Sequence, residues 1–408
     1  MKRSRLPLLA VLPVVVLSTV AASSLAFGDH PVRWESGSLL PSFGRGSDDP
    51  GTQPVKASKQ VTERTDGDGQ AADALRVDKP WKPGMPQWGV QIYWEDSPEN
   101  TAAEVERRAR QKAEYLVGLH ANSVAVSFPF FTKGPTSTKL FAGDKTPTPE
   151  HMDIVLKVFQ DAGLRVTMRP LMDEKSLNPP KGWRGNIAPA SRDDWFASYR
   201  TFLKPYVALA QKHEVRTFVI GAELNSLEGD PRWSSLAGQL EKTFKGELSY
   251  DANWDNYVSG RIDMPVNHLG VDAYFPLQVP DTASVGTLVK GWERWLDKKT
   301  TGPLPRIVLS EAGIGAMKGA YRAPGDFYNQ RAVDENVQAN WYEAVCKVVV
   351  DRKMAGVYWW SINFDDDPDV APGDDISRLH FAGRPKTEQV IRDCFGSDYQ
   401  GPGAAAAP

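Results

Sequence analysis

The sequence predicts an α/β fold, a (β/α)8 barrel of the TIM type. Strand-like and helix-like segments alternate between residues 85 and 395, and eight strands can be distinguished there. A stretch of that length lies within the size range of TIM barrels. A doubly wound open sheet is the alternative, but no glycine-rich phosphate-binding fingerprint follows any of the strands.

The predicted strands are short apolar runs, and the predicted helices are longer segments with amphipathic spacing. Thr101 with Glu104 forms a capping box at the first helix, and the second helix has Pro149 at its first position and Gly163 after its end. The strands are expected at residues 88–94, 122–131, 164–173, 217–223, 247–253, 269–277, 306–313 and 356–363. The helices are expected at residues 101–119, 148–162, 191–213, 231–244, 282–296, 333–352 and 386–394.

Both ends of the chain differ from the barrel in composition. Residues 1–26 are basic, then apolar, then small, which is typical of a signal peptide, with an uncleaved membrane anchor as the alternative. Residues 27–84 are rich in Gly, Ser, Asp, Pro and Thr and are expected to form a low-order linker, and residues 396–408 a flexible tail. We therefore expect a secreted or cell-surface protein that contacts a membrane only if the anchor is retained.

The overall composition is that of a soluble globular protein. The net charge of −3 gives no reason to expect nucleic-acid binding, and no Cys and His residues occur at metal-ligand spacing. The acidic run at residues 365–369 lacks the ligand pattern of a calcium loop and is interpreted as a solvated charged surface. We expect no cofactor, no metal and a monomer. Cys346 and Cys394 could form one disulfide or remain two buried thiols.

Two of the predicted strands end in a glutamate. Thr217–Ser226 (TFVIGAELNS) is an apolar run that stops at Glu223, and the run RIVLSEAG contains Glu311 in the corresponding place. In a TIM barrel these would be the fourth and seventh strands, whose ends can bring two carboxyls to the ~5–5.5 Å separation of a retaining glycosidase. Glu223 and Glu311 are therefore the candidate catalytic residues.

Polar and aromatic side chains lie at the other strand ends as well. Trp360 could stack on a sugar ring, Tyr274 could hydrogen-bond the nucleophile, and Arg169 could hold the nucleophile ionised. The candidate substrate-binding residues are Tyr93, Arg169, Asn225, Asn253, Trp254, Asp272, Tyr274 and Trp360.

The motifs together resemble glycoside hydrolase family 113, whose members are retaining β-mannanases with a TIM barrel. The resemblance extends over residues 88–392 and is carried by GLRVTMRPLMD, GWRGNIAP, FVIGAELNS, YDANWDN, LGVDAYFPL and LSEAG. It implies that Glu223 is the general acid/base and Glu311 the nucleophile. It also implies that Tyr274 lies near the nucleophile, that Trp360 is the platform of the eighth strand, and that Asn253 and Trp254 line the cleft.

Two positions depart from the pattern of the larger clan to which this family belongs. Ala222 stands where an asparagine is usual, so the contact to the sugar 2-hydroxyl is expected from Asn253 or Asn225. On the third strand, Arg169-Pro170-Leu171 replaces a Lys-Pro-His run.

The sequence thus predicts a secreted retaining glycoside hydrolase that cleaves a β-linked polysaccharide, with β-mannan as a candidate, through a covalent glycosyl-enzyme intermediate. The partner would be a polysaccharide or an oligosaccharide. Two alternatives stay open: a glycan-binding barrel with little or no turnover that acts in cell-surface polysaccharide metabolism, and a transglycosylase that uses the same residues.

Overall fold

A computed structural model of the chain describes residues 75–173, 177, 182–259, 262–298, 304–326, 331–370, 372 and 378–403. The predicted signal at residues 1–26 and most of the predicted linker lie outside the described residues, as do the last five residues of the predicted tail. The proposed domain limits therefore stay predictions.

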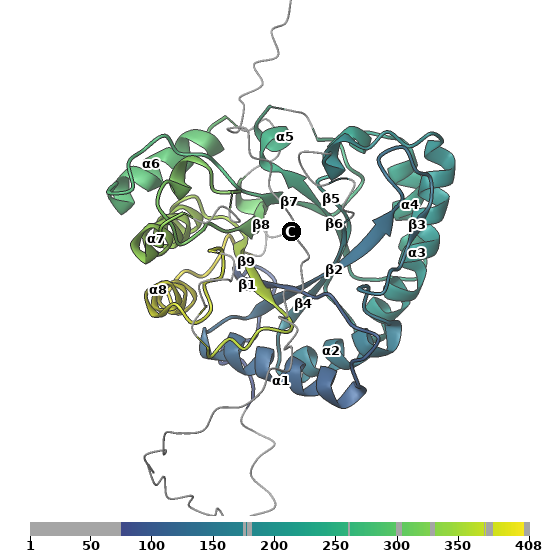
Figure 1. Cartoon of the computed structure of the whole chain (residues 1–408), viewed down its shortest axis with the longest axis horizontal. Coiled ribbons are helices and arrows are strands. Elements are labelled where there is room, and N and C mark those ends of the chain that lie inside the picture. The colour runs from purple at the N-terminus through teal and green to yellow at the C-terminus, as the bar shows by residue number, and fades with distance from the viewer. Residues whose placement is uncertain are drawn as a thin grey trace, which may run out of the picture.

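Eight parallel strands close into a barrel with helices on its outside, which confirms the predicted fold (Figure 1). The order around the barrel is β1-β9-β8-β7-β6-β5-β4-β2, and β1 pairs with β2 to close it. The barrel strands are β1 (Gln87–Tyr93), β2 (Ser123–Thr132), β4 (Arg165–Met172), β5 (Thr217–Ala222), β6 (Glu247–Asn253), β7 (His268–Asp272), β8 (Val308–Ala312) and β9 (Gly356–Asn363). The short strand β3 (Leu140–Phe141) pairs antiparallel with β2, so the fourth barrel strand is β5 and the seventh is β8.

The helices agree with the predicted ones to within a few residues at most ends. They are α1 (Ala102–Gly118), α2 (Pro149–Asp161), α3 (Arg192–Lys212), α4 (Arg232–Leu240), α5 (Trp254–Ser259), α6 (Val285–Leu296), α7 (Glu335–Asp351) and α8 (Pro385–Phe395). Helix α5 is not among the predicted elements. Neither are the short 3-10 helices at Arg184–Asn186, Asn225–Leu227, Leu304–Arg306 and Ala320–Arg322. No helix in the part of the chain that the structure describes is long and apolar enough to cross a bilayer.

The segment that precedes β1 packs across the end of the barrel where the strands begin. The Trp81 ring packs against two cations, with its centroid 4.7 Å from the guanidinium carbon of Arg165 and 5.5 Å from that of Arg216. Val77 is buried, and its backbone N–H donates to the Ala162 carbonyl at 3.0 Å. This segment therefore forms the floor of the barrel.

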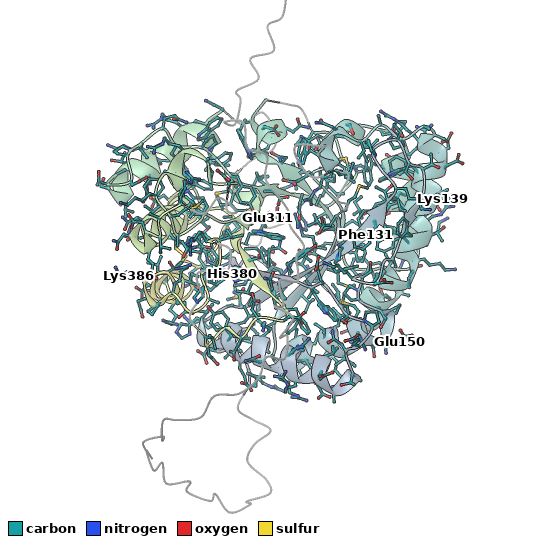
Figure 2. All side chains as sticks on the ribbon, viewed as in Figure 1. Phe131, Lys139, Glu150, Glu311, His380 and Lys386 are labelled. Atoms are coloured by element: carbon teal, nitrogen blue, oxygen red, sulfur yellow. A yellow bond between two sulfur atoms is a disulfide. The ribbon has the colours of Figure 1, made fainter. Side chains whose placement is uncertain are left out.

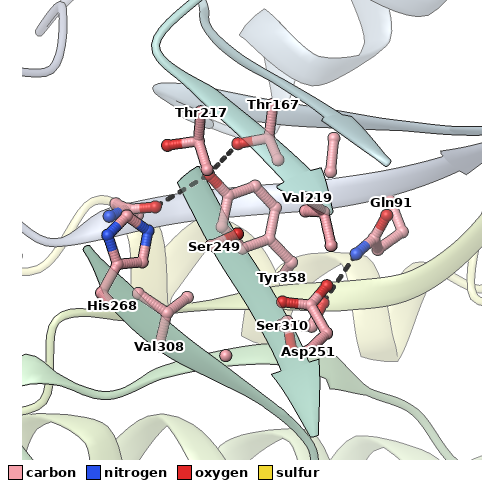
Figure 3. A pocket seen from close by; sticks show the side chains of 13 residues that line it. Gln91, Thr167, Thr217, Val219, Ser249, Asp251, His268, Val308, Ser310 and Tyr358 are labelled. Atoms are coloured by element: carbon pink, nitrogen blue, oxygen red, sulfur yellow. Dashed lines mark hydrogen bonds between the residues drawn. The ribbon is translucent and has the colours of Figure 1, made fainter. Parts of the chain in front are cut away.

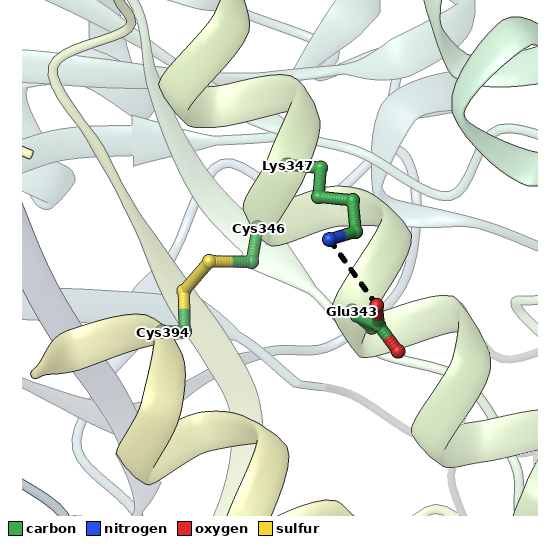
Figure 4. Close-up of a disulfide and its surroundings, with 4 residues drawn as sticks. All are labelled: Glu343, Cys346, Lys347 and Cys394. Atoms are coloured by element: carbon green, nitrogen blue, oxygen red, sulfur yellow. Dashed lines mark ion pairs between the residues drawn. A yellow bond between two sulfur atoms is a disulfide. The ribbon is translucent and has the colours of Figure 1, made fainter. Parts of the chain in front are cut away.

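A disulfide joins the last two helices (Figure 4). Cys346 on α7 and Cys394 on α8 are bonded, with their Cα atoms 6.0 Å apart and 48 residues apart in sequence. The sequence left open whether these cysteines form a disulfide or remain two thiols, and in the structure they form the disulfide. The bond fixes α8, the last helix, to the α7 surface beside it.

Removing this disulfide should destabilise the barrel. For a closed loop of that length the chain-entropy model gives a loss of about 4 kcal/mol, and measured losses for native disulfides are typically about 2–4 kcal/mol. We expect the Cys346→Ser/Cys394→Ser double variant to lose stability in that range in denaturant unfolding under non-reducing conditions. Wild-type protein treated with a reductant should behave like the variant. An unchanged unfolding midpoint would contradict a bonded pair.

Candidate active site

The two candidate catalytic glutamates lie at the end of the barrel where the strands finish. Glu223 directly follows β5, and Glu311 is the next-to-last residue of β8. The side chain of Glu311 lies near the barrel axis in Figure 2. Residues of the intervening strands lie beside them, because Ala222 is in register with Asp251 and Asp272 with Glu311. The closed barrel thus brings together two glutamates that are far apart in sequence.

Arg169 on β4 lies at the centre of a cluster of carboxylates. Its Nε is 2.6 Å from Oδ2 of Asp251, and its Nη2 is 2.8 Å from Oδ2 of Asp272 and 2.6 Å from Oε1 of Glu311. The guanidinium has no exposed surface. These are charge-assisted hydrogen bonds in a site without water screening, where they are strong and directional.

One guanidinium cannot neutralise three buried carboxylates. Burial raises the pKa of Asp251, and it raises the pKa of Asp272 well above the usual range, although Arg169 acts in the opposite direction on both. A side chain at Gly270 would collide with this cluster, because its Cβ would lie 2.3 Å from Oδ1 of Asp251.

Glu311 is held through both of its oxygens. Oε1 faces Arg169 at 2.6 Å, and Oε2 accepts a hydrogen bond from the Tyr274 hydroxyl at 2.6 Å. Both contacts were expected from the sequence. Two donors fix the orientation of the carboxylate and stabilise negative charge on it, which is what an attacking carboxylate needs.

Glu223 has a different environment. Its Oε1 accepts a hydrogen bond from the Asn253 side chain at 2.9 Å, and its Oε2 lies 3.8 Å from Nε of Arg184. Burial raises the pKa of Glu223 to about 7; Arg184 lowers it and the Glu311 charge raises it. A carboxyl with this pKa can both give and take a proton near neutral pH.

The backbone at Glu223 is unusual as well. Its φ of 53° lies in the left-handed region, which costs a non-glycine residue roughly 1–2 kcal/mol. Its N–H still donates to the Asp251 carbonyl at 2.8 Å, so the turn begins directly after the last ladder bond of β5. Backbone strain of this kind occurs preferentially at functional positions.

The remaining candidate residues surround these two glutamates at different depths. The Tyr93 hydroxyl donates to Oδ2 of Asp173 at 2.5 Å. Trp360 is 1% exposed and packs 5.9 Å from the Tyr93 ring, so its face is covered in this structure. The Trp254 ring packs against Phe275 and Trp295 and is also largely buried. The sugar-stacking roles of the two tryptophans stay predictions.

Two of the candidate substrate-binding residues do not line the site. Arg169 and Asp272 are completely buried and bonded to each other. In this structure their side chains have no exposed surface for a sugar to contact. The sequence pattern marks strand ends correctly, but it does not distinguish a side chain at the surface of the mouth from one in the layer below.

Other functional contacts were not predicted at all. Arg184 belongs to the quoted motif GWRGNIAP, yet nothing in the sequence indicated that it lies against Glu223. Asn225 was predicted, and its amide nitrogen lies 3.4 Å from Oδ1 of Asp255, a residue that was not. The buried Oδ1 of Asn225 has no hydrogen-bond partner among the described residues, so it is an acceptor that could still take a hydrogen bond.

A small polar cavity lies inside the barrel (Figure 3). It has a volume of about 20 Å³, enough for one water molecule, and Gln91, Ser249, Asp251, His268 and Ser310 are among its lining residues. The Gln91 side chain crosses the barrel and donates to the Ser310 carbonyl at 2.7 Å. This polar layer supports the Arg169 cluster from below and is too small for a sugar.

The acidic run after β9 is bound to α1 rather than simply solvated. Asp365 pairs with Arg108 at 2.6 Å, and the buried Lys112 donates to the Asp366 backbone carbonyl. Gln111 adds a hydrogen bond to Asp367 at 2.9 Å. Within the described residues, no group of three or more His, Cys, Asp or Glu side chains is arranged to hold a metal ion.

The chain is similar to known proteins in sequence and in fold. The family model for Glycoside Hydrolase Family 113 matches residues 99–374. A solved GH113 β-1,4-mannanase is 19% identical over 78% of this chain and 100% of its own, with a TM-score of 0.64. A GH113 β-mannanase from Alicyclobacillus acidocaldarius, solved in complex with ManMIm, is 20% identical over 77% of this chain and 97% of its own, with a TM-score of 0.61. No curated protein matches the chain.

The family model covers most of the chain, including both candidate catalytic glutamates and the cluster around Arg169. The solved structures share the whole barrel. The chain therefore belongs to glycoside hydrolase family 113, and it is a glycoside hydrolase.

Proposed function

We propose that the protein is a secreted retaining glycoside hydrolase that cleaves a β-linked polysaccharide, with β-mannan as the leading candidate. The observation that carries the proposal is the contrast between the two glutamates. Two donors, Arg169 and Tyr274, stabilise negative charge on Glu311, whereas burial raises the pKa of Glu223 to about 7. A nucleophile and an acid/base need these two opposite environments.

In the first step, Glu311 attacks the anomeric carbon while Glu223 gives its proton to the glycosidic oxygen of the leaving sugar. The bond between the anomeric carbon and that oxygen breaks, and an ester to Glu311 forms. In the second step, Glu223 takes a proton from water, the water oxygen bonds to the anomeric carbon, and the ester breaks. Two inversions at the anomeric carbon give net retention.

The choice of β-mannan is supported by the family and by the two structurally similar β-mannanases. The departure at Ala222 bears on how the sugar is held. Ala222 is buried and has no polar side chain, and the Asn253 amide already donates to Glu223. Asn225 keeps a buried acceptor without a partner among the described residues, so it is the better candidate for the sugar 2-hydroxyl.

Export is proposed from the N-terminal sequence alone. The order of basic, apolar and small residues in residues 1–26 supports a signal peptide. Mass spectrometry of the N-terminus of protein recovered from the culture medium would detect cleavage near Ala21 or Ala26.

Azide rescue of the Glu223→Ala variant tests the roles of the two carboxylates. On β-mannan or another responsive polysaccharide we expect turnover to fall about 10²–10⁴-fold, because the leaving group loses its acid and water loses its base. With an aryl glycoside, whose leaving group needs little protonation, azide should restore turnover and give a glycosyl azide of retained configuration. The exposed Glu241→Ala variant is the control and should keep wild-type rates.

The configuration of the first product, followed by proton nuclear magnetic resonance, provides a second criterion. An inverted product or an azide-insensitive Glu223→Ala variant would overturn the mechanism. If no β-linked polysaccharide is cut while a glycan array gives a signal, the glycan-binding alternative is favoured. Products longer than the starting oligosaccharide would indicate transglycosylation.

A further inference from the structure

Arg184 is a buried cation that approaches the proposed acid/base. It lies on the 3-10 helix Arg184–Asn186, its side chain is 5% exposed, and its Nε is 3.8 Å from Oε2 of Glu223. The other oxygen of Glu223 accepts from Asn253. We infer that Arg184 is a positioning residue that holds the Glu223 carboxylate opposite Asn253 and stabilises its ionised form for the second step. The inference rests on the proposed function, since it takes Glu223 to be the acid/base.

The segment that carries Arg184 is fixed to the segment that follows Glu223. The Ser226 hydroxyl, on the 3-10 helix after β5, donates to the Ile187 carbonyl at 2.6 Å. On the other side, the Ala188 N–H donates to the Pro135 carbonyl at 2.8 Å. Gly185 leaves no room for a side chain, because its Cβ would lie 2.1 Å from the Trp183 ring. The backbone that directly follows this short helix is therefore fixed by bonds to two other segments, and this restricts the path of the segment that carries Arg184.

The charges with the largest effects on Glu223 come from four elements. Two are cations and two are carboxylates: Arg184 on the 3-10 helix, Arg169 on β4, Glu311 on β8 and Asp255 on α5. Asp272 on β7 and the hydroxyls of Tyr250 and Tyr274 also interact electrostatically with Glu223. Arg169 is already bonded to three carboxylates, and of the two cations Arg184 has the larger effect on the pKa of Glu223. Arg184 is thus the principal group that opposes the effects of burial and of Glu311.

This position matters because Glu223 has to change roles within one cycle. When Glu311 forms the ester with the sugar, its negative charge disappears, so one of the two main causes of the raised pKa of Glu223 disappears with it. The charge on Arg184 persists. It then favours the carboxylate that takes the proton from water in the second step.

The pH dependence of Arg184→Gln tests the inference. The first step needs protonated Glu223, so kcat/KM of the wild type should fall as pH rises through about 7. Without Arg184 the pKa of Glu223 should rise, which moves this alkaline limb upward by about one pH unit. With an aryl glycoside, for which the second step limits turnover, kcat should fall by up to about tenfold at pH values below the pKa of Glu223 in the intermediate. Arg184→Lys should restore most of kcat and of the wild-type limb.

The matched control is Arg200→Gln, which removes the same charge from an exposed side chain on α3 that bonds only to Gln239 among the described residues. It should leave both the limb and kcat unchanged. The inference is overturned if the alkaline limb of the kcat/KM profile of Arg184→Gln stays at the wild-type pH or moves to lower pH. An equal loss of activity at every pH, or a rise in KM alone, also overturns it.

Should Arg184→Gln fail to fold, Arg184→Lys and Arg184→Met form a second pair that differs in charge at similar length, and the same comparison of limbs applies. Azide rescue of Glu223→Ala does not involve Arg184. Failure of that rescue therefore counts against the proposed function. If azide rescues Glu223→Ala but the alkaline limb of Arg184→Gln does not move, only the role of Arg184 is contradicted.

Discussion

Glu311→Gln is expected to lower kcat by at least about 10⁴-fold on any substrate of the enzyme, because the amide cannot form the ester to the anomeric carbon. The glutamine keeps the shape of the side chain and can still accept from Tyr274. Turnover of an aryl glycoside and of a polysaccharide should fall alike, since the nucleophile is needed whatever the leaving group is. This distinguishes it from Glu223→Ala, for which the aryl glycoside should suffer less.

The same variant should remain folded. Replacing Glu311 removes one negative charge from a cluster in which three carboxylates share one guanidinium, and Asp251 and Asp272 still bond to Arg169. We expect its free energy of unfolding to be equal to that of the wild type or higher. Labelling of the wild type by a 2-fluoro glycoside, followed by peptide mass spectrometry, should place the sugar on Glu311. Label on another residue, or more than a hundredth of wild-type kcat in Glu311→Gln, would refute the assignment.

Arg169→Met is expected to be the most destabilising single change. It leaves Asp251, Asp272 and Glu311 buried without their cation, and breaking a buried ion pair in this way costs about 3–5 kcal/mol. The free energy of unfolding, measured in denaturant, should fall by that amount. Activity should fall as well, because Glu311 loses one of its two donors.

A surface arginine provides the control. Arg352→Met breaks pairs with Glu293 and Asp297 that are partly exposed, and it should cost less than about 1 kcal/mol. Adding Asp272→Asn to Arg169→Met should recover part of the lost stability, since it removes one of the stranded charges. If Arg169→Met were no more destabilising than Arg352→Met, the cluster would not be held by charge.

The sequence predicts those parts of the site that follow from short-range pattern. Glu223 and Glu311 end apolar strands, and strand ends meet at one face of a parallel barrel, so both could be located without coordinates. The same reasoning correctly anticipated that Arg169 and Tyr274 contact Glu311. Tyr274 follows β7, the neighbour of β8, whereas Arg169 reaches Glu311 from β4 across the barrel.

What could not be predicted depends on loop geometry or on depth. Arg184 reaches Glu223 from a loop whose path is set by contacts such as Ser226 with Ile187, and no periodicity encodes such contacts. The complete burial of Asp272 and the covered face of Trp360 depend on which layer of the barrel each side chain occupies. Alternation along a strand gives the direction of a side chain but not what lies above it.

The floor of the barrel has a consequence for how the chain can be shortened. The indole of Trp81 covers Arg165, and Nη2 of Arg165 donates to Thr217 and Glu247 at the start of β5 and β6. A protease cut or an expression boundary placed at the first residue of β1 would remove the indole and open this cationic end to solvent. A shortened chain that keeps this end of the barrel covered therefore has to include Val77 and Trp81, before the first strand.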